Sequence, residues 1–370
     1  MITVLVSSLV IFYLLLIVYF WFGWEKAQPC EVEEDHDLSL SVVIAVRNEE
    51  EGITGLLNDL DNQTYLKSLV EVIIIDDHSS DLTIDKIELF KGSSSLDLKL
   101  IELDDKRGKK AAMALGFSQA SNDIILTTDG DCRVKTDWLK AMSACFINQK
   151  VKLVSGPVQM MLQDTFFRRM QAIEFSSLIA SGAATISMNW PTMANGANMA
   201  IRRTVIGKIS EMDGQKTVSG DDVFLLHKIK IAFKEAIIFC KNEEAIVETS
   251  SSAVINSFIQ QRRRWAGKWQ FYKDTSTILL AVFIFIVNLA IVLLPILVFS
   301  NYITWFVATN LIVVKIAFEY WYLKTVQIFF DSKIRPFEFI ILAFIYPLYV
   351  SLVAITSLIG SSTWKGRVST

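Results

Sequence analysis

The chain has 370 residues, of which 52% are hydrophobic, and its mean hydropathy of +0.39 is too high for an ordinary soluble protein. The formal net charge is −3, and no long basic stretch occurs outside residues 262–268, which argues against nucleic acid as a partner. The length suits one catalytic domain with added membrane helices.

The chain opens with an uncharged apolar run, residues 2–24, which is long enough to cross a bilayer as a helix. It lacks the basic start and the cleavage site of a signal peptide, so we expect residues 1–24 to be a retained transmembrane anchor. No Lys or Arg precedes this run and Lys26 follows it, which predicts that the next residues are cytosolic. Residues 25–37 are acidic and are interpreted as a linker.

Residues 38–249 alternate short apolar strands with loops and helices, which predicts an α/β domain with a mostly parallel sheet. The expected strands are residues 41–46, 71–75, 98–101, 123–128 and 151–155. Open α/β sheets bind ligands beyond the carboxyl ends of their strands, and charged residues follow three of these strands.

Asp129 and Asp131 come directly after an apolar strand, separated by one glycine. Carboxylates repel a nucleotide diphosphate unless a divalent cation lies between them, and Mg²⁺ or Mn²⁺ is commonly held by one or two carboxylates together with substrate phosphates. A solvated turn is the alternative, because Asp and Gly also favour turns. We expect a metal site formed by Asp129 and Asp131.

Asp76 and Asp77 end another strand, and at most one of them needs to face a ligand because adjacent side chains diverge there. A carboxylate at this place suits a hydrogen bond to a base or ribose, while the following residues 79–81 can cap a helix. The basic stretch 106–110 is predicted to open a helix whose N-terminus would attract phosphate, although a solvated basic turn is equally compatible with the sequence.

Asp221 and Asp222 follow a glycine and precede an apolar run. A general base must be a carboxylate or similar group within hydrogen-bond reach of the proton that it accepts. Acids in the first turn of a helix explain the pattern equally well, and the two explanations are compatible.

Residues 250–275 are predicted to form an interfacial helix containing Gln261, Arg264 and Trp265. Arg can bind phosphate through two parallel hydrogen bonds, and Trp offers an apolar face to a sugar ring. A cytosolic basic patch with an interfacial Trp is the structural alternative. Residues 276–370 are expected to hold about three membrane helices; the apolar runs are residues 278–299, 303–323 and 337–359.

A full crossing of the last apolar run, residues 337–359, would place Lys365 and Arg367 outside the cell, so a shallow or re-entrant segment is the alternative at this place.

Other chemistries find little support. The four cysteines are widely spaced, which indicates neither a zinc site nor a disulfide framework and fits a reducing cytosol. The chain has no phosphate-loop motif and no serine hydrolase motif.

Taken in order, these motifs resemble glycosyltransferase family 2, the inverting enzymes with a GT-A, Rossmann-like nucleotide-diphospho-sugar transferase fold. The resemblance covers about residues 38–275 and is greatest to membrane-integrated members such as polysaccharide synthases and ceramide glucosyltransferases. Residues 42–50 resemble the opening strand, with Ala45 where Pro is common; Asp76 to Asp81 match D-D-x-S-x-D. Asp221 stands where the base motif E-D-x-x-L usually has Glu, and residues 261–265 match Q-x-x-R-W.

The resemblance implies roles for individual residues. It makes Asp222 the catalytic base and assigns the metal to Asp129 and Asp131. It places Asn195, Asp221 and Trp265 near the acceptor. The donor-binding residues that it implies are Arg47, Glu49, Asp77, Lys109, Asp129, Gln261, Arg264 and Trp265.

We therefore expect an inverting hexosyltransferase of a bacterial cytoplasmic membrane, with a cytosolic catalytic domain. It would move a hexose or N-acetylhexosamine from a nucleotide sugar, most simply a UDP-sugar, to a lipid or lipid-linked acceptor. A processive synthase that extends a β-linked glycan is the alternative, but about four helices are few for a monomer to build a polymer channel. An inactive nucleotide-sensing membrane subunit is an alternative of another class.

Overall fold

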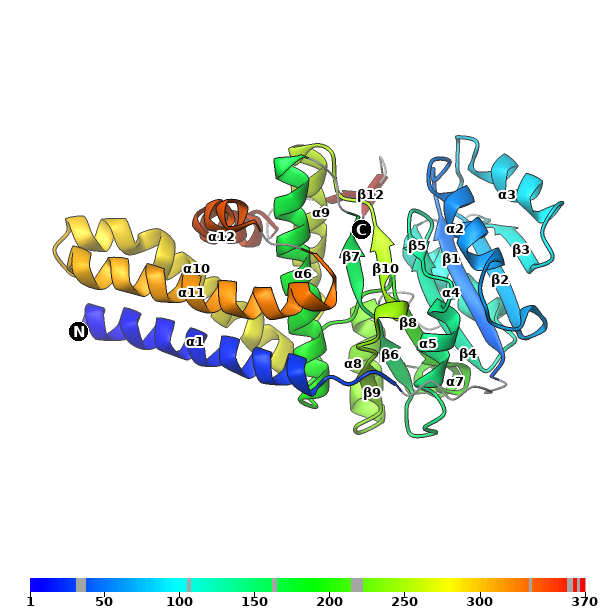
Figure 1. The fold of residues 1–370 in the computed structure, drawn as a ribbon, viewed down its shortest axis with the longest axis horizontal. Coiled ribbons are helices and arrows are strands. Elements are labelled where there is room, and N and C mark those ends of the chain that lie inside the picture. Colours follow the sequence, from blue (N-terminus) through cyan, green and yellow to red (C-terminus); the bar gives the residue numbers. More distant parts are fainter. Residues whose placement is uncertain are drawn as a thin grey trace. The chain divides into compact units, whose positions relative to one another are not determined.

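The structure is a computed structural model (Figure 1) that describes residues 1–30, 38–104, 108–161, 165–213, 222–332, 335–357, 362–364 and 367–369. Its chain divides into two compact units. The sheet unit comprises Lys26–Met161 and Thr185–Ser250, and the helical unit comprises Met1–Glu25, Leu162–Ala184 and Ser251–Thr370.

A seven-stranded sheet with the order β3-β2-β1-β4-β8-β6-β9 forms the centre of the sheet unit (Figure 1). The strands are β1 (Leu40–Val46), β2 (Val70–Asp76), β3 (Asp97–Glu102), β4 (Ile124–Asp129), β6 (Leu153–Ser155), β8 (Met199–Arg202) and β9 (Ile237–Phe239). β8 runs antiparallel to β4 and β6, while the other pairings are parallel. The predicted α/β class with a mostly parallel sheet is confirmed, and β1, β2, β3, β4 and β6 match the five expected strands.

Helices cover this sheet, and β1 and β2 are buried along their whole length. Strands of a parallel sheet are apolar on both sides because crossover helices lie on both faces. The helices of the unit are α2 (Ile53–Asp61), α3 (Thr83–Lys91), α4 (Lys109–Gln119), α5 (Trp138–Ala144), α7 (Arg203–Asp213) and α8 (Asp222–Ala232). A second sheet has the order β5 (Arg133–Val134), β10 (Val247–Thr249), β7 (Val158–Met160). The short 3-10 helices are η1 (Lys67–Leu69) and η2 (Glu243–Ala245).

In the part of the helical unit that the structure describes, four helices are long and apolar enough to cross a membrane. They are α1 (Ile2–Lys26), α10 (Thr275–Phe299), α11 (Trp305–Phe329) and α12 (Pro336–Ser357). They correspond to the four predicted apolar runs, which supports a membrane protein; the side of the membrane on which the sheet unit lies stays a prediction. The other elements are α6 (Phe166–Ser187), most of which belongs to this unit, α9 (Ile255–Gly267), η3 (Lys268–Phe271) and the strand pair β11 (Ser362–Trp364) and β12 (Arg367–Ser369).

The helix α6 departs from the expected single domain over residues 38–249. Its first part belongs to the helical unit. Side chains of α6 contact this unit: Gln171 donates to the carbonyl of Ser252 at 2.9 Å, Gln327 donates to Ser176 Oγ at 2.6 Å, and apolar side chains of the helix pack there as well. The sequence pattern of alternating strands and helices contains no signal for these distant contacts.

The cysteines also depart from expectation. Cys30 and Cys145 form a disulfide across a sequence separation of 115 residues, while Cys132 and Cys240 are free and buried. The interpretation that no disulfide is present was therefore wrong. Sequence spacing could not reveal the pair, because only the fold of the sheet unit brings its two members together.

Candidate active site

The carboxyl ends of three neighbouring strands meet at one edge of the large sheet. Val46 at the end of β1 pairs in register with Asp76 of β2, and Ala45 pairs with Asp129 of β4. The loops that follow β2 and β4 therefore flank the loop that follows β1, which carries Arg47 and Glu49. The structure thus brings these predicted residues to the same edge.

Asp77 is fully buried, and a hydrogen bond links it, directly after β2, to the residue before α4. Its Oδ2 atom accepts a hydrogen bond from the backbone N–H of Gly108 at 3.0 Å, and Arg47 Nη1 donates to the Asp77 carbonyl at 2.8 Å. Gly108 has a φ of 100°, a conformation that favours glycine. The helix end predicted to attract phosphate therefore begins directly beside the predicted nucleotide-binding carboxylate.

Lys109, the first residue of α4, lies among three predicted site carboxylates. Its Nζ atom is 2.5 Å from Asp129 Oδ1, and Asp222 and Asp131 also act on it electrostatically. Burial works to lower the pKa of Lys109, but Asp129 first and then Asp222 and Asp131 outweigh it and raise the pKa above its ordinary value. The lysine therefore stays charged at neutral pH and marks the point where the three carboxylates converge.

Asp222 is held by the backbone of a neighbouring loop. Its Oδ2 atom accepts from the Gly196 N–H at 2.8 Å, and the carbonyl of Gly196 accepts from Thr127 Oγ1 of β4 at 2.7 Å. Asn195 shapes the same loop, because its Oδ1 accepts from the Ala197 N–H at 3.0 Å. Asp222 is thus linked to the strand that ends in Asp129. Asp221 lies outside the described residues.

Two glycines allow the loop after β1 to approach the Asp129–Asp131 loop closely. A Cβ on Gly52 would lie 2.9 Å from Asp131 Cα, and a Cβ on Gly130 would lie 3.0 Å from Glu49 Cγ. Real Cβ atoms do not approach backbone this closely, so the position of Asp131 depends on the absence of a side chain at Gly52.

We expect Gly52→Ala to weaken Mn²⁺ binding in the presence of a nucleoside diphosphate by about 10–100-fold, the range seen when a ligand's support is removed. The new methyl group must displace Asp131 or its backbone. Electron paramagnetic resonance of unbound Mn²⁺ measures the affinity. Gly55→Ala is the matched control, because its Cβ would meet only the flexible side chain of Arg133 at 3.3 Å; equal affinities for the two variants would contradict the prediction.

The Q-x-x-R-W residues lie on α9 in the helical unit and are organised by Arg262, which the sequence reasoning did not single out. Arg262 Nη1 donates to Gln261 Oε1 at 2.8 Å, and its guanidinium lies 4.3 Å from the ring centroid of Trp265. Arg262 Nε and Nη2 both donate to the carboxylate of Glu174 on α6. Arg264 is half-buried, and its predicted role stays a prediction.

The residues that sequence reasoning missed are Glu174, Arg262 and Gly196. Glu174 and Arg262 are 95% and 96% buried as side chains, a setting in which a charge requires a partner. The signal that could have revealed Glu174 is its acidic side chain between Ile173 and Phe175 in a largely apolar helix. Gly196 carried no such signal, because its role depends on a backbone N–H.

Residues 41–209 match the family described as Glycosyl transferase family 2. The chain is 30% identical over 185 residues to the glycosyltransferase AglE of Haloferax volcanii, an alignment that covers 50% of this chain and 59% of that protein. It is 30% identical over 167 residues to the poly-beta-1,6-N-acetyl-D-glucosamine synthase of Staphylococcus aureus, covering 44% of this chain and 40% of that protein. The chain thus spans less than two thirds of these relatives.

Among solved structures, the mannosyltransferase PcManGT from Pyrobaculum calidifontis, determined in complex with GDP-Man and Mn²⁺, matches with a TM-score of 0.58. The match covers 97% of this chain and 98% of that one at 18% sequence identity. At this identity the likeness establishes the fold, and the predicted GT-A class with terminal apolar helices is confirmed.

Proposed function

Because the chain belongs to glycosyl transferase family 2, we propose that it transfers a hexose or N-acetylhexosamine from a nucleotide sugar to a lipid or lipid-linked acceptor at the membrane. One observation carries the proposal: Lys109 lies within electrostatic reach of Asp129, Asp131 and Asp222. A sugar transfer needs a diphosphate site and a proton-accepting group around a single anomeric carbon, and these four residues offer both.

The donor diphosphate would bind at the start of α4, between Lys109 and the Asp129–Asp131 loop. Asp129 and Asp131 offer hard oxygen ligands, which fit Mg²⁺ or Mn²⁺. A cation bound there would offset the charge that develops on the leaving diphosphate. Lys109 contributes positive charge at the same place, and Asp77, beside the start of α4, is the proposed contact for the base or ribose. The solved neighbour that contains GDP-Man and Mn²⁺ supports this class of donor and metal.

Asp222 is the proposed general base. Two backbone N–H groups hold its carboxylate, those of Gly196 at 2.8 Å and of Val223 at 2.9 Å, which fixes its orientation. The carboxylate takes the proton of the acceptor hydroxyl as that oxygen attacks the anomeric carbon from the side opposite the diphosphate. A single displacement of this kind inverts the anomeric centre, so an α-linked donor gives a β-linked product.

A processive polysaccharide synthase is the second candidate, and the name of one relative favours it. A polymer needs a path across the bilayer, whereas a lipid acceptor can enter from the side of the bilayer. The candidate spans among the described residues, α1, α10, α11 and α12, favour the lipid acceptor because these helices alone are few to enclose a growing chain.

The nature of the product tests the proposal. We expect purified full-length protein, incubated with radiolabelled nucleotide sugars, Mn²⁺ and extracted membrane lipids, to give a lipid carrying a single sugar. Thin-layer chromatography and size-exclusion chromatography separate this product from a polymer. A high-mass glycan product would favour the processive synthase over transfer to a lipid. Absence of sugar transfer from every UDP- and GDP-sugar tested would contradict the proposed function.

A further inference from the structure

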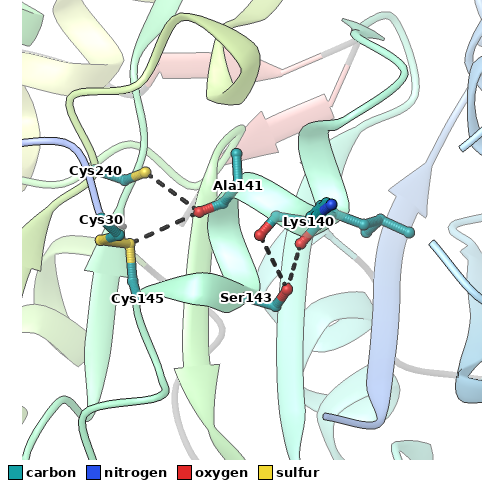
Figure 2. The surroundings of a disulfide bond; sticks show 7 residues. Cys30, Lys140, Ala141, Ser143, Cys145 and Cys240 are labelled. Atoms are coloured by element: carbon teal, nitrogen blue, oxygen red, sulfur yellow. Dashed lines mark hydrogen bonds between the residues drawn. A yellow bond between two sulfur atoms is a disulfide. The ribbon is translucent and has the colours of Figure 1, made fainter. Parts of the chain in front are cut away.

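Three cysteine sulfurs converge in the sheet unit, at a place that the proposed function does not use (Figure 2). Cys30 follows α1 closely in the chain, Cys145 directly follows α5, and Cys240 directly follows β9. Their Sγ atoms all lie within 4.8 Å of one another. Three segments that are distant in sequence thus each deliver a sulfur to the same point.

The surroundings of the cluster resemble those of a ligand site. Cys145 and Cys240 are 3% and 0% exposed, whereas Cys30 is half-buried. An ion held by the three sulfurs would therefore have two buried ligands, Cys145 and Cys240, and one partly exposed ligand, Cys30. A water molecule entering beside Cys30 could complete a fourth position.

Cys240 is a neutral thiol in the metal-free protein. Burial raises the pKa of Cys240 to about 12, although backbone hydrogen bonds of Cys30 and Asn242 act to lower it. A bound cation would displace this proton, because the thiolate is the form that binds metals. The Sγ atoms of Cys145 and Cys240 both contact the Ala141 carbonyl oxygen (Figure 2), at distances of 3.8 Å and 3.6 Å. A disulfide sulfur has no proton to donate, so the contact of Cys145 is a hydrogen bond only in the reduced thiol.

We propose that Cys30, Cys145 and Cys240, once the disulfide is reduced, bind one thiophilic divalent cation of the zinc class. Zinc–sulfur bonds of about 2.3 Å in a tetrahedron place sulfurs about 3.8 Å apart. After reduction the sulfurs of Cys30 and Cys145 would move apart by about 2 Å, and the widest pair of the cluster would contract by about 1 Å or less. This site differs in ligand chemistry from the carboxylates Asp129 and Asp131, which suit harder cations.

The conversion between the two states is chemically balanced. A phosphine reductant and one water molecule turn the disulfide into two thiols and a phosphine oxide. The cation then displaces the protons of three thiols, two from the former disulfide and one from Cys240. In an oxidising compartment the disulfide connects the segment after α1 to the end of α5. In a reducing compartment the bound cation would connect that same segment to the ends of both α5 and β9.

Cobalt provides an optical test, because a Co²⁺–thiolate bond absorbs in the near ultraviolet whereas a Co²⁺–carboxylate bond does not. We expect full-length protein in detergent, reduced with a phosphine and freed of reductant without air, to develop this band with one Co²⁺ per chain. Zn²⁺ should bleach it, and unreduced protein should not develop it. A reduced protein that shows no thiolate band overturns the proposal.

Single substitutions locate the site. Cys30→Ser changes a half-buried side chain and is expected to weaken Co²⁺ binding by at least about a hundredfold, since it removes a ligand rather than a ligand's support. Cys132→Ser is the matched control, because Cys132 is the remaining cysteine of the chain and lies beside Asp131. Cys240→Ser, checked by thermal unfolding, repeats the test at a buried position. A band that survives Cys30→Ser, or one that disappears in Cys132→Ser, overturns the assignment.

Discussion

Replacing Asp222 by Asn is expected to reduce sugar transfer by about 10²–10⁴-fold, the usual contribution of a general base, while donor affinity stays close to that of the wild type. The amide keeps the size of the carboxylate and can still accept from the Gly196 N–H, but it cannot take the acceptor's proton. Turnover measured by nucleoside diphosphate release, together with donor binding measured by calorimetry, separates the two effects.

Asp85→Asn is the control for this substitution. Asp85 and Asp222 both lie in the first turn of a helix, so both can interact with the helix dipole. A carboxylate that only stabilised the start of α8 would behave like Asp85 and leave turnover nearly unchanged. If Asp222→Asn turned over at the wild-type rate, Asp222 would not be the general base, and its carboxylate would only stabilise the start of α8.

Glu174→Gln is expected to destabilise the helical unit by about 3–5 kcal/mol, because it leaves the Arg262 guanidinium buried without a countercharge. Arg262 also lies over the Phe258 ring at 4.6 Å, so it has little room to reach solvent. Thermal unfolding of the full chain in detergent measures the loss. Asp61→Asn, which breaks the more exposed pair with Lys67, is the control and is expected to cost less than about 1 kcal/mol.

The double substitution Glu174→Met with Arg262→Met separates stability from function. Replacing both members of a buried ion pair by apolar side chains is often neutral, so the unfolding temperature should return towards that of the wild type. Gln261 and Trp265 would lose their contacts with Arg262, however, and we expect the turnover of the double variant to be lower than that of the wild type. Unfolding of Glu174→Gln at the wild-type temperature would contradict the assigned role of the pair.

The features that could be predicted from the sequence are those set by short stretches of chain. The strands β1, β2 and β4 are buried stretches rich in Val, Ile and Leu, and the rule that ligands bind beyond the carboxyl ends of such strands places Asp77 and Asp129 at one edge. The four apolar helices follow from length and composition alone. A family resemblance then linked the distant Asp222 to the same site.

The features that were missed depend on contacts between distant residues. The Cys30–Cys145 disulfide, the Glu174–Arg262 pair and the hydrogen bond of Gly196 to Asp222 leave no periodic signal in the sequence. The role of the Q-x-x-R-W residues at the donor stays a prediction, because α9 belongs to the helical unit and the Lys109 cluster belongs to the sheet unit.

Nucleoside diphosphate release from a sugar donor, measured side by side on the wild type and Asp222→Asn with and without Mn²⁺, tests the proposed transferase most directly. We predict release by the wild type only when both the cation and an acceptor lipid are present, and almost none from the variant. Release at equal rates from both proteins, or no release from any nucleotide sugar, would contradict the proposal that these carboxylates and Lys109 form one sugar-transfer site.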